Sequence, residues 1–225
     1  MIIPIYNEEN TLLEILNRVN SQSTDEFNLE IIVIDDCSTD GSQKIMESNL
    51  DLVSNYIKLE KNGGKGKAVR EGLKKATGDY ILFQDGDLEY NPEDYNKIFK
   101  VIESFDADII IGSRFLSPEY TRVHYFFHKV GNRTITLIFN LLYNTTFTDI
   151  YSCYLCFKRS LITPEKLKTN GWEQQAEILA KAVKTSSVHY EVPISYSGRT
   201  FEDGKKIKAR HSLSVIYAIL KYRLF

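Results

Sequence analysis

The chain has 225 residues, 43% of them hydrophobic and 26% charged, so it can bury an ordinary core and is neither disordered nor fibrous. A formal net charge of -2, from 28 basic and 30 acidic residues, gives no general attraction for nucleic acid. Three cysteines do not form the disulfide framework of a small secreted domain, and no apolar stretch approaches the roughly 20 residues that span a bilayer. We expect a cytoplasmic protein that does not bind nucleic acid.

Residues 2–112 alternate apolar runs with amphipathic segments, which is typical of a parallel sheet with helical crossovers. The first five residues lack the basic leader of a signal peptide and instead predict a strand. In chain order, the expected strands are residues 2–5, 29–34, 51–59, 80–83 and 108–111, and the expected helices are residues 8–19, 40–46, 65–76 and a helix opened by Pro92. From residue 113 onward the pattern is less regular and richer in aromatic and basic residues. The sequence predicts one α/β domain with a specialised second half.

Polar residues follow the first four predicted strands. They are Tyr6, Asn7 and Glu8, then Asp35 and Asp36, then residues 62–67, and finally Asp85-Gly86-Asp87. In open parallel sheets, ligands bind outside the carboxyl ends of the strands. We therefore expect these four strand ends to face one crevice.

The triplet Asp85-Gly86-Asp87 indicates a metal site. Its glycine lets the backbone turn, so both carboxylates can approach one hard cation and leave positions for phosphate oxygens. Mg²⁺ or Mn²⁺ shared with a diphosphate fits this pattern. The alternative is a solvated acidic turn, and the place of the triplet at a strand end favours the metal site.

The glycine-rich segment of residues 62–67 precedes a predicted helix, whose amides and positive end can accept an anion. The segment is not a Walker loop, because the glycine spacing and the Ser or Thr after Lys are absent. The alternative is that the glycines serve only a tight strand-to-helix turn. The sequence does not separate these two interpretations.

Several motifs together resemble glycosyltransferase family 2, whose members have the GT-A fold. They are residues 4–9, 34–40, 64–66, 84–87, 112–114, 148–149, 171–173 and 191–194, which cover nearly the whole chain. Within that family, residues 112–114 and 199–207 are most similar to the polyprenyl-phosphate (dolichyl-phosphate) sugar transferases. That subgroup usually has Ala where this chain has Gly86, and many of its members carry membrane helices after the catalytic domain.

The resemblance implies a nucleotide-sugar-binding half at residues 1–112 and an acceptor-side half at residues 113–225. Its donor residues, matched by motif, are Pro4, Tyr6 and Glu8 lining the nucleotide pocket, Asp36 on the base, Lys65 near the base, and Asp85 and Asp87 holding the ribose and the metal-bound diphosphate. Asp35 would orient the loop. A uridine diphosphate donor is favoured, with guanosine diphosphate as the alternative.

The resemblance also implies an inverting transfer to a polyprenyl-phosphate or glycan acceptor. A hydroxyl acceptor needs a carboxylate base within hydrogen-bond reach, for which Asp149 and Glu173 are the candidates, whereas a phosphate acceptor needs none. The Asp87 carboxylate joins the catalytic set through the metal. The basic side chains expected to contact anions are Arg114, Arg133 and Arg199.

The C-terminal segment, residues 199–225, has seven Lys or Arg residues against two acids, with Leu213, Ile216, Tyr217 and Leu220 at helical spacing. This pattern is compatible with an amphipathic helix on an anionic membrane, which would place the protein peripherally on the cytoplasmic face. The slightly favoured alternative is a helix that packs its apolar side on the domain. The apolar residues 131–147 fit an acceptor lid, a lipid-facing helix or core.

Two other functions remain open at this stage. A nucleotidyltransferase can use a related sheet and acidic metal site, but it would release pyrophosphate from a nucleoside triphosphate. A catalytically silent sugar-nucleotide-binding protein could keep the fold, although the presence of Asp36, Asp85 and Asp87 disfavours it. The sequence leaves the sugar and the oligomeric state undecided.

Overall fold

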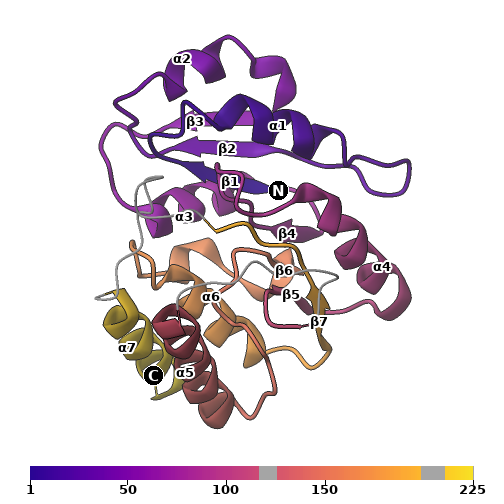
Figure 1. Ribbon diagram of the computed structural model, residues 1–225, viewed down its shortest axis with the longest axis vertical. Coiled ribbons are helices and arrows are strands. Elements are labelled where there is room, and N and C mark those ends of the chain that lie inside the picture. The colour runs from indigo at the N-terminus through magenta and orange to yellow at the C-terminus, as the bar shows by residue number, and fades with distance from the viewer. Residues whose placement is uncertain (117–125, 199–210, 225) are drawn as a thin grey trace.

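The computed structural model describes residues 1–116, 126–198 and 211–224. The strands are β1 (Ile2–Ile5), β2 (Ile32–Asp35), β3 (Asn55–Lys58), β4 (Tyr80–Leu82), β5 (Ile109–Ser113), β6 (Leu155–Lys158) and β7 (His189–Pro193). The α-helices are α1 (Leu12–Asn20), α2 (Ser42–Glu47), α3 (Lys65–Lys75), α4 (Tyr95–Phe105), α5 (Phe126–Tyr143), α6 (Gln174–Val183) and α7 (His211–Leu224). In Figure 1 the strands occupy the middle of the molecule, with α1 and α2 at one end and α5 and α7 at the other. The expected α/β class is confirmed.

The strands form two sheets, ordered β1-β2-β3 and β4-β6-β5-β7. A parallel bridge between Ile2 and Phe83 joins β1 to the end of β4. The first sheet is parallel, whereas β6 runs antiparallel between β4 and β5. Strand β6 is not among the strands expected from the sequence. Its place between β4 and β5 is therefore a new finding. Residues from both halves of the chain therefore share one sheet.

The core is built from apolar side chains that recur at the spacing of a helix or a strand. Helix α1 buries Leu12, Ile15, Leu16 and Val19, while Leu13, which has the wrong phase, is 41% exposed. Strand β2 is buried at all four positions, as expected for a strand covered on both faces. Full burial of an aliphatic side chain contributes about 1.5–3 kcal/mol, so these two elements stabilise the packing of residues 1–112.

Several predicted boundaries were wrong by a few residues. Strand β3 begins at Asn55 rather than at residue 51, because residues 50–52 form a 3-10 helix. Helix α1 begins at Leu12 rather than at residue 8, because Asn7 has a φ of 53° and the amide of Glu8 donates to Ser42 Oγ at 2.9 Å. Strand β2 begins at Ile32 and includes Asp35, which pairs in register with Ile5 of β1. Residues 7–10 thus form a loop packed against the segment before α2, and this loop enters the candidate site.

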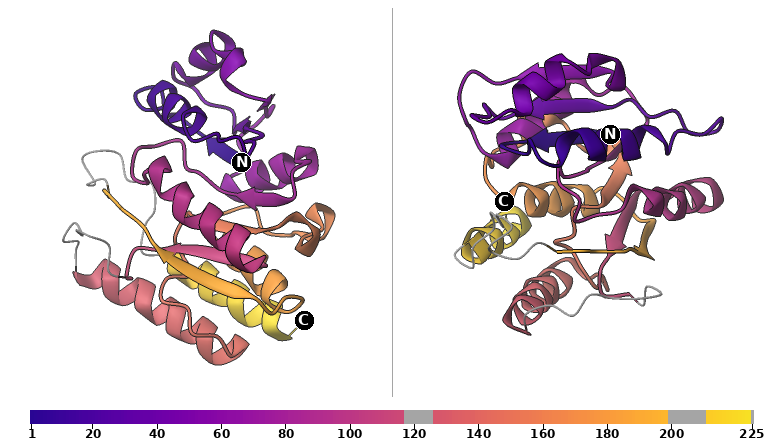
Figure 2. Two further views of the ribbon diagram at one scale, coloured as in Figure 1. Left: turned by 90° about the vertical axis from the view of Figure 1, so that its right-hand side faces the viewer. Right: turned by 45° about the horizontal axis from the view of Figure 1, so that its top comes forward.

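Helices α5 and α7 lie side by side in both Figures 1 and 2. The C-terminal helix packs on the domain, as slightly favoured, but the predicted face was wrong, since α7 buries Val215, Ala218, Ile219 and Tyr222 instead. Its opposite face is also apolar: the exposed side chains there are Leu213, Tyr217, Leu220 and Leu224. No helix among the residues described is both long enough and apolar enough to cross a membrane.

Candidate active site

The acidic triplet lies against the loop that follows β1. Thr11 Oγ1 donates to the carbonyl oxygen of Gly86 at 2.9 Å, which ties the loop to the triplet. A Cβ on Gly86 would lie 2.8 Å from Ile5 Cγ2, so the close approach of β1 requires glycine here. Asp87 is 6% exposed and accepts the amide of Glu89 at 3.0 Å, whereas Asp85 is partly exposed. Two predicted strand ends therefore meet at the triplet.

Lys65, the first residue of α3, forms an ion pair with Asp85 of the triplet. Its Nζ lies 2.5 Å from Asp85 Oδ1 and 5.4 Å from the centroid of the Trp172 ring. Burial, the largest single effect, would lower the pKa of Lys65, but the surrounding groups, Asp85 first among them, together raise that pKa, so the ammonium stays charged. Asp85 is thus already a cation-binding group in this structure.

The amides of the glycine-rich segment are bound by the protein itself. Gly63 and Gly64 donate to the two oxygens of Asp36 at 2.7 and 2.8 Å, and Gly66 and Lys67 donate to the carbonyl of Asn170 at 2.7 and 3.3 Å. The interpretation of this segment as an anion cradle was wrong, because these four donors have protein partners. The glycines serve close packing instead: a Cβ on Gly66 would lie 2.7 Å from the Asn170 carbonyl carbon.

The paired acids after Ile34 have separate surroundings. Asp35 is fully buried, accepts the amide of Ser38 at 2.7 Å and the Tyr56 hydroxyl at 3.2 Å, and so holds the following loop, as expected. Asp36 is 3% exposed and holds the Gly63–Gly64 turn. In this structure the Asp36 carboxylate positions the Gly63–Gly64 turn. Contact between Asp36 and a nucleotide base stays a prediction.

The predicted acceptor residues Arg114 and Asp149 bind each other. Arg114 Nε and a terminal amino group donate to the two Asp149 oxygens at 2.7 and 2.8 Å, and the Arg114 amide donates at 3.1 Å. Asp149 is fully buried. This geometry speaks against Asp149 as the base, because a base must reach the acceptor hydroxyl. The Arg114 guanidinium also lies 5.1 Å from the Tyr196 ring centroid. Arg114 was expected to contact an anion of the acceptor, but in the structure its anionic partner is Asp149.

Glu173 lies at the entrance of α6 in a partly exposed position, and its Oε1 accepts the amide of Gly171 at 3.3 Å. The neighbouring Trp172 carbonyl accepts the Tyr151 hydroxyl at 3.0 Å. Burial, the largest effect, raises the pKa of Tyr151, which also experiences the charges of Lys65 and Glu173. Tyr151 thus lies among Lys65, Trp172 and Glu173 in the candidate site, although the sequence did not single it out. The one sequence signal for it is its position two residues after Asp149.

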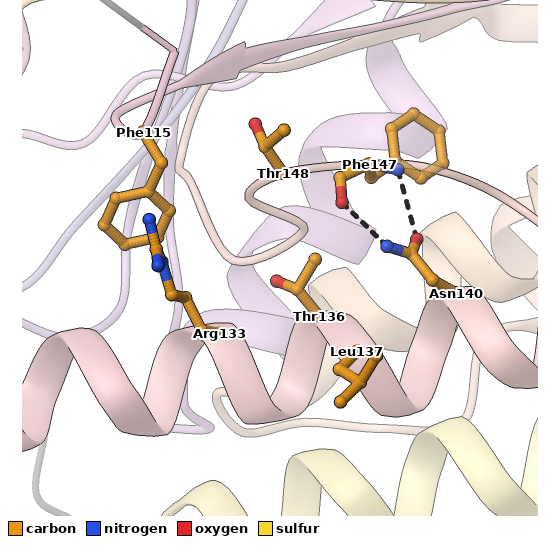
Figure 3. Close-up of a pocket in the computed structure, with 7 residues that line it drawn as sticks. All are labelled: Phe115, Arg133, Thr136, Leu137, Asn140, Phe147 and Thr148. Carbon is orange, nitrogen blue, oxygen red and sulfur yellow. Dashed lines mark hydrogen bonds between the residues drawn. The ribbon is translucent and has the colours of Figure 1, made fainter.

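Arg133 lies on α5 at a pocket of about 250 Å³. The pocket is lined by Phe115, Arg133, Thr136, Leu137, Asn140, Phe147 and Thr148. Figure 3 shows Arg133 beside Phe115 on one side of the pocket, with Asn140 bonded to the backbone of Phe147 on the other. Arg133 is exposed, and its guanidinium carbon lies 5.8 Å from the Phe115 ring centroid.

The remaining predicted residues lie around the β1 end. Pro4 is half-buried within β1, Tyr6 is 37% exposed, and Glu8 accepts the Thr11 hydroxyl at 3.4 Å. Arg199 lies outside the residues that the structure describes. The site thus gathers the β1 loop, the triplet, Lys65 and the Trp172–Glu173 segment, while Asp149 is set back in the core.

A family model described as glycosyl transferase family 2 matches residues 1–163 of the chain. The chain belongs to this family. It is 28% identical over 228 residues to dolichol-phosphate mannosyltransferase of Pyrococcus furiosus, covering 99% of this chain and 63% of that protein. It is also 28% identical over 243 residues to UDP-N-acetylglucosamine--dolichyl-phosphate N-acetylglucosaminyltransferase of Methanococcus voltae, covering 100% and 95% of the two chains.

Among solved structures, the family 2 chain is similar to glucosyl-3-phosphoglycerate synthase of Mycobacterium tuberculosis. The TM-score is 0.72 at 16% identity, and the match covers 100% of this chain and 79% of that one. This similarity confirms the expected GT-A fold. The chain spans 61–63% of the length of several curated relatives that it matches.

Proposed function

We propose that the protein transfers a sugar from a nucleoside diphosphate donor to an acceptor. The observation that carries this proposal is the convergence of Asp85, Asp87 and Lys65 at neighbouring strand ends, where a sheet of this kind binds its ligand. The family supports it, since relatives are named as sugar transferases.

We propose Asp85 and Asp87 as the holders of Mg²⁺ or Mn²⁺. The Lys65 ammonium at 2.5 Å from Asp85 supports a site for a cation, and two carboxylates are the oxygen ligands that these ions prefer. The described residues contain no group of three or more His, Cys, Asp or Glu side chains suited to a metal, so donor phosphate oxygens would supply the other ligands. The bound ion would neutralise charge on the departing diphosphate. A synthase of similar fold is described in complex with Mn²⁺ and uridine diphosphate.

The proposed transfer is inverting. The acceptor oxygen forms a bond to the anomeric carbon as the bond from that carbon to the diphosphate oxygen breaks, and the nucleoside diphosphate leaves. Lys65 stabilises the negative charge that grows on the leaving group. With a hydroxyl acceptor, Glu173 takes the proton, because its carboxylate is partly exposed whereas Asp149 is buried. With a phosphate acceptor, no base is needed.

We propose uridine diphosphate as the donor nucleotide and a polyprenyl phosphate as the acceptor. The name of the Methanococcus voltae relative gives UDP-N-acetylglucosamine as its donor and dolichyl phosphate as its acceptor. Arg133 beside its pocket supplies a cation next to apolar walls, which suits an anionic head with an apolar chain. The exposed apolar side chains of α5 and α7 support a peripheral membrane contact: they include Phe126, Phe127, Leu141, Leu213 and Leu224.

The test is a transfer assay with dolichyl phosphate in detergent and a panel of UDP and GDP sugars, with Mn²⁺ or with EDTA. We expect lipid-linked sugar and released nucleoside diphosphate in equal amounts with one UDP sugar, and loss of both with EDTA. Asp85→Asn and Asp87→Asn should each lower kcat by about 10²-fold or more. The exposed Asp51→Asn is the matched control and should keep its activity.

Three outcomes would contradict the proposal. Release of pyrophosphate from a nucleoside triphosphate would identify a nucleotidyltransferase. Nucleotide-sugar binding without turnover of any tested acceptor would indicate a silent binding protein. Full activity in both triplet variants would move the donor site elsewhere.

A further inference from the structure

Lys65 contacts two parts of the candidate site at once. Its ammonium pairs with Asp85 at 2.5 Å and lies 5.4 Å from the centre of the Trp172 ring. Asp85 belongs to the triplet after β4, whereas Trp172 precedes α6 on the acceptor side. A single charged group therefore bridges the donor and acceptor segments, and any ligand that competes for Asp85 also changes the surroundings of Trp172.

The backbone of Trp172 is held independently of Lys65. Its carbonyl accepts the Tyr151 hydroxyl at 3.0 Å, and the preceding Asn170 carbonyl accepts two amides from the start of α3. The indole ring stacks with His211 of α7, with centroids 6.1 Å apart and planes 23° apart. The ring thus lies between a cation from α3 and an imidazole from α7. Loss of one neighbour would alter the ring while its backbone stays fixed.

We propose that Lys65, besides its proposed contact with the leaving diphosphate, couples donor binding to the acceptor segment, an inference that rests on the proposed function. In this structure Lys65 neutralises Asp85. A metal cation competes for the Asp85 carboxylate and the donor diphosphate attracts the ammonium, so Lys65 leaves Asp85, turns towards the diphosphate and changes its contact with the Trp172 ring. The Trp172 backbone stays fixed, so donor binding changes the position of the indole ring and with it the side-chain surface beside Glu173 that an acceptor meets. Sugar is then transferred to the acceptor in preference to water.

The chain contains one tryptophan, so tryptophan fluorescence reports on the surroundings of this one ring. A cation over an indole ring perturbs the ring electrostatically, and its removal changes the emission. The experiment titrates wild type, Lys65→Met and Lys75→Met with Mg²⁺ and uridine diphosphate at one fixed pH, and measures binding of the same ligands by calorimetry. Lys75 is an exposed residue at the end of the same helix and controls for loss of one positive charge.

We expect wild type and Lys75→Met to change their Trp172 emission on binding, with midpoints that match calorimetry. Lys65→Met should start from an altered emission and show at most a third of that change at saturation. With Mn²⁺ alone, Lys65→Met should bind the ion about three- to tenfold more tightly than wild type, because the competing ammonium is gone. In the transfer assay the variant should raise the acceptor KM and increase hydrolysis of the donor relative to transfer.

The outcomes separate the two proposals. If wild type binds no nucleotide by calorimetry, the proposed function fails and the coupling fails with it. If wild type binds nucleotide but its Trp172 emission does not change, or changes equally in Lys65→Met, the donor site stands and the coupling is refuted. Unchanged Mn²⁺ affinity in Lys65→Met would also overturn the proposal, because the ammonium would not be a competitor at Asp85.

Discussion

The buried pair of Arg114 and Asp149 makes a prediction that separates a structural role from a catalytic one. The Asp149 side chain is fully buried and the Arg114 side chain is 12% exposed. Removing one partner of such a pair leaves the other charge buried without compensation, which costs about 3–5 kcal/mol. For a chain of this length, each kcal/mol moves Tm by about 2–4 °C. We therefore expect Asp149→Ala to lower Tm by roughly 10 °C.

The assay is thermal unfolding followed by circular dichroism, with urea unfolding as a second measure. Asp149→Asn should lose less stability than Asp149→Ala, because its amide oxygen can still accept one bond from Arg114. The double variant Arg114→Met, Asp149→Ala should lose less free energy of unfolding than the two single variants lose together, by about 0.5–3 kcal/mol. An unchanged Tm together with loss of kcat in Asp149→Ala would refute the structural role and restore Asp149 as a base candidate.

Three further predictions concern stability. Gly66→Ala should lower the free energy of unfolding by about 1–3 kcal/mol, because the new methyl group would overpack the site. Gly131→Ala should raise it by about 0.5–1 kcal/mol, because a Cβ on this helical glycine meets nothing within 4 Å. The urea midpoints of the two variants should therefore shift in opposite directions. Tyr56→Phe should cost about 0.5–1.5 kcal/mol, because its hydroxyl donates to a buried carboxylate of β2, whereas the exposed Tyr217→Phe should be neutral in the same assay. Burial alone would raise the pKa of Glu177, but hydrogen bonds from a lysine, a threonine and backbone amides lower it below its ordinary 4.5. The stability from Glu177 is therefore complete above pH 4.5 and lost as pH falls through the lowered pKa, so the difference in urea midpoint between wild type and Glu177→Gln should disappear on acidification.

Local patterns predicted the donor half well. Strand β1 and helix α3 lie within a residue of their predicted bounds, because apolar periodicity and glycine turns act over a few residues. The triplet was found through its place after an apolar strand. The start of β2 was wrong by three residues, since the strand begins only at Ile32, where its pairing with Ile2 of β1 begins.

The acceptor half was less predictable. Strand β6 has a short apolar run without a clear period, and its antiparallel position between β4 and β5 depends on how the sheet closes. Arg114 and Asp149 were both chosen as chemical groups, yet the sequence could not indicate that they satisfy each other across 35 positions. A charged residue looks the same in sequence whether it faces a ligand or a buried partner.

The sequence by itself determined the family, the α/β class and the acidic triplet, because these depend on local order and spacing. Only the tertiary structure decided which polar groups remain for ligands. The glycine-rich amides are bound to Asp36 and Asn170, Asp149 is bound to Arg114, and Lys65 bridges Asp85 and Trp172. These pairings join residues far apart in the chain, and folding brings them together because buried polar groups must find partners.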